Sequence, residues 1–456
     1  MLYRSERQKN AEWKSEEKRK KMVKVDEEAM LAGEGGSSVL MTCVTMVKTS
    51  IGTGALALPF TYARGGVVPT VLMLVFLAAW NEFCGLRLIG CMSLLSPGEK
   101  NAYEASTESR LAALARVALG GSVGAALVEI VFFCLVFGIV TSYLVAAHDT
   151  LSAYSSLGNK DVYVAALLAL PLTQARDVGK LAPVAMFGLF ALFAAFAVTL
   201  FYCYYDINDR SLNWLGPEKD ALSTWASGFG VLSFSFGVVP LAPQFAESMR
   251  DPKDFKVAQR YALALTVFVY IILGVSVAFL DPNVPGNVLG LLPAGAPPAL
   301  VAKVTVGLVC VASTPIPVVA AAEIIEKKVT HKRTAGFIAR TLLLFGSAFA
   351  ADKVPDFALV VSIVGAATVS FLSFVLPLLL HLSLLLRQKT RSRRRNTTDT
   401  TRLLPYSDDH NITTRTILLD LIALIFGIIV VLFATALVTA NAIHHPPHQT
   451  TPPSSP

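Results

Sequence analysis

The sequence predicts an all-α integral membrane protein with eleven transmembrane helices. Its 456 residues are 54% hydrophobic and only 16% charged, and their mean hydropathy is +0.57. These values are wrong for a soluble globular domain. Apolar runs of about 20 residues, the length that crosses a bilayer, recur along the chain. The net charge of +7 resides mainly in short loops between these runs, which indicates membrane topology and not a nucleic-acid partner.

The chain begins with a hydrophilic stretch, residues 1–37, that is dense in charges of both signs. It has too little apolar surface to fold, so we expect a disordered cytoplasmic tail. The predicted helices are 38–61, 66–95, 121–149, 161–175, 180–204, 222–248, 257–280, 299–325, 335–351, 356–386 and 415–442. Residues 387–414 form a basic cytoplasmic loop, and residues 443–456 form a disordered tail on the outer or lumenal side.

The distribution of Lys and Arg predicts the orientation. With eleven crossings and a cytoplasmic N-terminus, thirty of these residues fall in the tail and the cytoplasmic loops, against about six on the opposite side. This asymmetry is the positive-inside rule. One helix more or fewer would mix the two groups of loops, so the asymmetry also favours the count of eleven.

The first predicted helix is interrupted at mid-length by Gly52-Thr53-Gly54. Glycines weaken a helix, and lipid cannot hydrogen-bond the backbone groups that a break frees. Such breaks at the bilayer midplane hold the substrate in many secondary transporters. A close helix–helix contact through small residues explains the same tripeptide without any binding role, and taken alone it leaves both interpretations open.

The sixth predicted helix has a second interruption. Residues 232–240 read Leu-Ser-Phe-Ser-Phe-Gly-Val-Val-Pro, in which serines, glycine and proline break an apolar run. Breaks in the first and sixth of eleven helices favour two five-helix halves of inverted topology. We expect these halves at about 38–204 and 222–386, with 415–442 as an added helix.

Residues 47–60, Val-Lys-Thr-Ser-Ile-Gly-Thr-Gly-Ala-Leu-Ala-Leu-Pro-Phe, resemble the first transmembrane helix of the amino acid/auxin permease family. The resemblance is nearest to its proton-assisted and vacuolar amino acid transporters. The sixth helix is also similar, with its Phe-Ser segment and the run Glu247-Ser-Met-Arg-Asp-Pro-Lys-Asp-Phe255. Further similar segments are 312–317 with 323–326, and 354–357 with 365–367 and 376–377. The family usually has a histidine where this chain has Val238.

The resemblance implies a LeuT-like fold and a secondary transporter that moves a small amino acid together with a proton. No buried carboxylate is evident in the side-chain pocket region, which favours a neutral substrate. The substrate carboxylate should meet amides near Gly52, Thr53 and Gly54. Its ammonium should meet carbonyls and hydroxyls around Ser50, Phe234 and Ser235. The complete expected site is Ser50, Ile51, Gly52, Thr53, Gly54, Phe234, Ser235, Phe236 and Gly237.

Ionisable residues at membrane depth are costly and often mark function. Lys48 is either a fixed cation near the ion site, which would disfavour sodium, or a lysine whose stem reaches the interface. Glu82 is a coupling candidate that could pair with Lys48 or with a neighbouring helix. Glu247 could form an inner gate with Arg250 or Lys327, and Thr314, in the similar eighth helix, is a further gating candidate.

The remaining signals are weaker. No catalytic motif and no cluster of Cys or His ligands occurs, so we expect no enzyme activity, cofactor or metal. Asp399–Leu404 has the acidic-dileucine spacing that sorting adaptors read, which is compatible with the plasma membrane or with a vacuole or lysosome. Sodium coupling, or an amino acid sensor that signals through its N-terminal tail, stays open as an alternative. A channel is disfavoured because no polar stripe runs through several helices.

Overall fold

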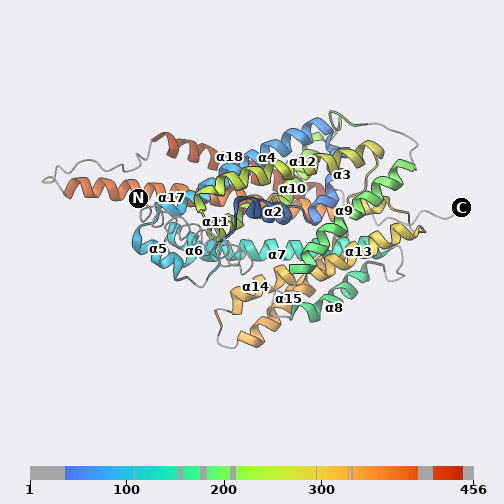
Figure 1. Cartoon of the computed structure of the whole chain (residues 1–456), viewed down its shortest axis with the longest axis horizontal. Helices are drawn as coiled ribbons and strands as arrows, with labels where there is room; N and C mark the ends of the chain where they lie inside the picture. The colour runs from blue at the N-terminus through green and yellow to red at the C-terminus, as the bar shows by residue number, and fades with distance from the viewer. Residues whose placement is uncertain are drawn as a thin grey trace, which may run out of the picture.

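The computed structural model describes residues 36–106, 108–152, 158–174, 182–205, 212–293, 295–326, 328–329, 332–398 and 414–444. The chain in these ranges is helical, with one isolated β-bridge between Ser37 and Met249. The long helices run side by side along one axis (Figure 1). Most of both predicted tails (residues 1–35 and 445–456), the segment Asp399–Leu404 and Lys327 lie outside the described residues.

Helices of very different length follow one another along the chain. They are α2 (Val39–Ser50), η1 (Thr53–Ala57), α3 (Leu58–Gly65), α4 (Val67–Leu94), α5 (Pro97–Glu104), α6 (Arg110–Leu119), α7 (Ser122–Leu151), η3 (Gly158–Lys160), α8 (Asp161–Thr173), α9 (Ala182–Tyr205), α10 (Ala221–Ser235), η5 (Val239–Leu241), α11 (Ala242–Ser248), η6 (Pro252–Asp254), α12 (Phe255–Leu280), η7 (Val288–Leu291), α13 (Pro297–Ser313), α14 (Pro315–Glu326), α15 (Lys332–Lys353), α16 (Phe357–Val364), η8 (Gly365–Val369), η9 (Phe371–Val375), α17 (Leu376–Thr398) and α18 (Thr414–His444).

Within the described residues, nine helices are long and apolar enough to cross a membrane. The bent pair Val39–Ser50 and Thr53–Gly65 makes a tenth span if it is counted as one. The multi-pass membrane protein expected from composition is therefore confirmed, whereas the count of eleven is not. The difference is α8, whose 13 residues extend over about 20 Å, short of the roughly 30 Å hydrocarbon core.

Arg340 of α15 holds the end of the short helix α8. Its Nη1 atom lies 3.4 Å from the carbonyl oxygen of Thr173 and 3.3 Å from that of Gln174. Its Nη2 atom donates to Glu326 Oε1 at 2.8 Å. The guanidinium thus satisfies carbonyls that a helix end leaves without partners, and it does so while almost fully buried.

Contacts between loops show which of them share an end of the bundle. At one end, Ser37 pairs with Met249, and Arg391 at the end of α17 forms an ion pair with Glu99 of α5. At the other end, the amide of Val67 donates to Asn213 O at 2.8 Å. The contacts at the first end join segments that the count of Lys and Arg predicted to be cytoplasmic. The contact at the second end joins segments that it predicted to be on the outer or lumenal side.

Candidate functional site

The first membrane span is broken where the sequence predicted. α2 ends at Ser50, and the axis turns by 53° before Thr53–Gly65 continues. Gly52 adopts an extended backbone at the break, with φ −126° and ψ −156°. The first hydrogen bond of η1 runs from Ala55 N to Gly52 O at 3.0 Å, so the amides of Thr53 and Gly54 have no partner within that helix.

The second predicted interruption is also present. α10 ends at Ser235, and a turn over residues 236–238 leads into η5 and α11. Pro240 lies inside η5, and because proline has no backbone N–H it cannot continue the hydrogen bonding of α10. The two halves of this span carry Ser235 and Val239 at the edges of the break.

The two breaks lie against each other. A Cβ atom on Gly54 would be 2.7 Å from Ser235 Oγ and 2.9 Å from the ring of Phe234, so only glycine allows this approach. The hydroxyl of Tyr270, on α12, lies 2.7 Å from Ser50 O and 2.9 Å from Ser235 O. Tyr270 therefore joins the carbonyl ends of α2 and α10, and it is fully buried.

A cavity of about 420 Å³ opens beside the first break, and we call it the central cavity. α2 and the break contribute Lys48, Thr49, Ile51, Gly52 and Thr53. The other walls come from α7, α9, α13 and α14, and they include Ile139, Tyr143, Leu192, Cys310, Ser313 and Ile316. Its volume falls within the range of about 300–1,000 Å³ usual for small-molecule sites.

Lys48 gives the central cavity its charge. Among the described residues, no Asp or Glu lines the cavity, and no hydrogen bond or ion pair engages the Lys48 ammonium. Most of the lining is apolar. The Lys48 cation and the Thr53 amide, which has no partner within η1, thus lie at one wall, and both favour an anionic group there.

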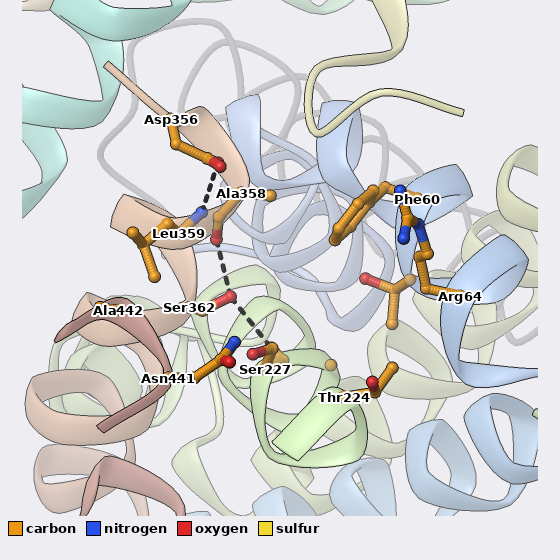
Figure 2. A pocket seen from close by; sticks show the side chains of 12 residues that line it. Phe60, Arg64, Thr224, Ser227, Asp356, Ala358, Leu359, Ser362, Asn441 and Ala442 are labelled. Carbon is orange, nitrogen blue, oxygen red and sulfur yellow. Dashed lines mark hydrogen bonds between the residues drawn. The ribbon is translucent and has the colours of Figure 1, made fainter. Parts of the chain in front are cut away.

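A second cavity of about 220 Å³ lies between α3, α10, α16 and α18, and it is lined by residues that include Arg64, Ser227, Asp356, Ser362 and Asn441 (Figure 2). Figure 2 shows Asp356 and Arg64 on opposite sides of it. Two of its polar side chains, those of Asp356 and Ser362, already form hydrogen bonds to the backbone. Asp356 accepts from the amide of Leu359 at 2.9 Å and caps α16, and Ser362 donates to backbone carbonyls of Ser227 and Ala358. The central cavity is therefore the stronger candidate.

The structure brings only part of the predicted site to the central cavity. Ile51, Gly52, Thr53 and Lys48 line it. Ser50 and Gly54 are buried at the junction with the second break, where they meet the buried Ser235 and the half-buried Phe234. Phe236 is buried, with its ring 5.7 Å from that of Tyr270, and Gly237 faces Val369; neither lines the cavity.

The predicted gating residues have partners away from the cavity. Glu82 pairs with Arg260 on α12 at 2.7 Å, so it contacts a neighbouring helix and not Lys48. Glu247 binds Arg110 at 2.9 Å and accepts from the Tyr103 hydroxyl at 2.6 Å.

The α5–α6 hairpin supplies these partners of Glu247, where the sequence suggested Arg250 or Lys327; Lys327 lies outside the described residues. Burial and the Glu247 carboxylate raise the pKa of Tyr103. Thr314 lies between α13 and α14, where its hydroxyl donates to Cys310 O at 3.0 Å, and its neighbour Ser313 lines the cavity.

Sequence reasoning missed Tyr270 and Tyr143. Both lie in continuous apolar runs, where a tyrosine looks like any core aromatic. The one signal in the sequence is that a buried phenol needs a hydrogen-bond partner, which does not say where that partner lies.

Comparison with known proteins decides the family. The family model of transmembrane amino acid transporter proteins matches residues 35–404. The chain belongs to the amino acid/auxin permease family. This family membership confirms the resemblance seen in residues 47–60, and the match includes both interrupted spans.

Individual members of the family are distant from this chain. The amino acid transporter ANT1 of Arabidopsis thaliana is 26% identical over 391 residues, which cover 77% of this chain and 86% of the relative. The vacuolar amino acid transporter 3 of Saccharomyces cerevisiae is 22% identical over 420 residues, 88% of this chain and 56% of the relative. The proton-coupled amino acid transporter-like protein pathetic of Drosophila melanogaster is 22% identical over 368 residues, 75% of this chain and 76% of the relative.

Proposed function

We propose that this protein is a secondary active transporter that moves small neutral amino acids across a membrane by alternating access, with a proton as the coupling ion. One observation carries the proposal: the central cavity opens at a broken helix, where Lys48 and Thr53, whose amide has no partner within η1, lie at one wall. Membership of an amino acid transporter family supports the substrate class.

The cavity matches the parts of a neutral amino acid. The substrate carboxylate would meet the amides of Thr53 and Gly54 and the Lys48 ammonium. The apolar side of the cavity would take the side chain, and the absence of acidic residues among its described lining disfavours a cationic one. The ammonium would be received by hydroxyls and carbonyls near the breaks.

The positions of the breaks support a LeuT-like arrangement. One break lies in the first span of the first predicted half, residues 38–204, and the other lies in the first span of the second half, residues 222–386. With α8 as the short fourth crossing and α18 as the added helix, the chain has eleven crossings. The excess of Lys and Arg on one side supports a cytoplasmic N-terminus. The family's vacuolar members favour a vacuolar or lysosomal membrane over the plasma membrane.

Lys48 favours a proton over sodium as the coupling ion. A fixed ammonium at the break repels a sodium ion from the same wall of the cavity. The similarity to a relative whose name describes proton coupling points in the same direction.

The first test is uptake of radiolabelled amino acids into proteoliposomes with an inward proton gradient and no sodium. We expect accumulation that collapses when a protonophore is added. Uptake that needs sodium would overturn the coupling ion and keep the substrate class. Binding without transport under either gradient would replace the carrier by a sensor.

The site itself is tested by Thr53→Trp, which fills the central cavity at the break. Uptake should be abolished while expression and membrane insertion persist. The matched control is Thr45→Trp, at an exposed position of α2 in the same broken span, which should transport like the wild type. Normal uptake by the Thr53 variant would show that substrate binds elsewhere.

A further inference from the structure

Three ionisable side chains meet between α4, α17 and α18, away from both cavities. His381 Nδ1 lies 2.7 Å from Asp420 Oδ2, and Arg87 Nε lies 2.9 Å from Asp420 Oδ1. The Asp420 side chain is fully buried and that of His381 is 7% exposed. The contact with Arg87 is an ion pair by distance without the alignment of a hydrogen bond, so the imidazole is the only well-aligned partner of this carboxylate among the described residues.

The arrangement fixes which nitrogen of His381 can take a proton. A carboxylate only accepts hydrogen bonds, so Nδ1 carries the hydrogen and Nε2 holds the free lone pair. Nε2 has no hydrogen-bond partner in the described part of the chain. It faces Gly90 of α4, where a Cβ atom would lie 3.3 Å from it, and glycine leaves that space open.

No other charged side chain contacts this group within the described ranges. α4 adds only the thiols of Cys84 and Cys91 near Asp420. Helices α10 and α16 and segments η8 and η9, which pack around α17 and α18, carry no ionisable side chain. The charged residues of neighbouring helices have other partners: Arg110 with Glu247, Arg116 with Glu108, and Arg260 with Glu82.

We propose that His381, held by Asp420, is the site that binds and releases the coupling proton. This inference rests on the proposed proton-coupled transport. The proton adds to Nε2 and leaves from the same atom, so the group changes by one unit of charge with no other bond broken. One Asp420 oxygen accepts from the Nδ1–H group of His381, and Arg87 lies beside the other oxygen.

The position of the group links it to the broken helices. α18, which carries Asp420, packs along α10, the first half of the second interrupted span. α4, which carries Arg87, packs against α12, and α12 carries the Tyr270 hydroxyl that joins both breaks. A change of charge in this group therefore acts on helices in direct contact with the substrate region.

The variant His381→Gln, studied in proteoliposomes, distinguishes two roles of His381. It either binds the coupling proton or only holds α18 against α17 through Asp420. Two rates are measured: uphill accumulation under a pH gradient, and exchange of labelled for unlabelled amino acid at equal pH, which requires no net proton movement. We expect accumulation to be lost and exchange to be retained, with the pH dependence of uptake abolished. If accumulation and exchange fall together while the residual uptake keeps the wild-type pH profile, His381 is only structural and the inference is overturned.

Gly90→Ala provides a second variant in case the first does not fold. It leaves the ion pair intact and places a methyl group against Nε2, so the midpoint of the pH profile should move toward lower pH. An unchanged midpoint would overturn the inference. These failures differ from a failure of the proposed function, in which the wild type itself would show no accumulation driven by protons.

Discussion

Replacing Tyr270 by Phe removes the single hydroxyl that joins the two helix breaks. That hydroxyl has one proton and lies 2.7 and 2.9 Å from two buried carbonyl oxygens. A net hydrogen bond contributes about 1 kcal/mol, and a buried acceptor left unpaired costs about 1–3 kcal/mol. We therefore expect Tyr270→Phe to lower the free energy of unfolding by about 1–3 kcal/mol. Where the substitution destabilises the substrate-binding conformation relative to the others by about 1–2 kcal/mol, the affinity for substrate falls by about five- to thirtyfold.

Tyr62 supplies a matched control for this substitution. It is also fully buried, but its hydroxyl has no hydrogen-bond partner among the described residues. Tyr62→Phe removes a desolvated polar atom that gains nothing in the folded state, so stability should stay the same or rise. Both variants are compared by denaturant unfolding in detergent and by amino acid binding to the purified protein. Equal behaviour of the two would refute the role assigned to the Tyr270 hydroxyl.

Two further predictions concern packing and pH. Gly365→Ala should lower the free energy of unfolding by at least about 3 kcal/mol or prevent folding, because its methyl group would overlap the carbonyl oxygen of Gly230 on α10. The control is Gly237→Ala, whose methyl group would have its nearest neighbours 3.5 Å away. Both variants are compared by expression level and by denaturant unfolding. The Arg391 guanidinium lowers the pKa of Glu99 from 4.5 to about 2. The ionised carboxylate therefore stabilises the fold above about pH 4.5, and this stability is lost as the pH falls from there toward 2. Arg391→Gln should flatten that part of the unfolding profile, and an unchanged profile would contradict the pairing.

The sequence was sufficient for features that are set locally. The break at Gly52 and the turn before Pro240 follow from the backbone properties of glycine and proline. Most apolar runs appeared as helices, because about 20 apolar residues have few other stable arrangements in lipid. The fourth run, predicted as a helix over 161–175, is the short helix α8 of 13 residues, and its end is held by Arg340 from a helix far along the chain.

Partners distant in sequence could not be predicted. The choice of Arg260 for Glu82 depends on which helix packs against α4, and helix packing leaves no pattern in one sequence. The same holds for Arg110 and Glu247. Asp420 was missed, although a carboxylate within an apolar run is costly and is a reason to suspect function. What the sequence could not supply is that His381 and Arg87 are its partners.

The hydrogen bonding of the backbone groups at the two breaks indicates which end of an amino acid the central cavity would bind in the proposed transporter. A break in a membrane helix exposes carbonyls on one side and amides on the other, and neither can be left to lipid. In this chain the carbonyls of Ser50 and Ser235 receive the Tyr270 hydroxyl, whereas the amides of Thr53 and Gly54 have no partner within η1. The Lys48 ammonium, unpaired among the described residues, lies at the same wall. The groups left over are therefore donors, so in the proposed transport cycle the cavity would select the carboxylate first, and the ammonium would use the second lone pair of each carbonyl.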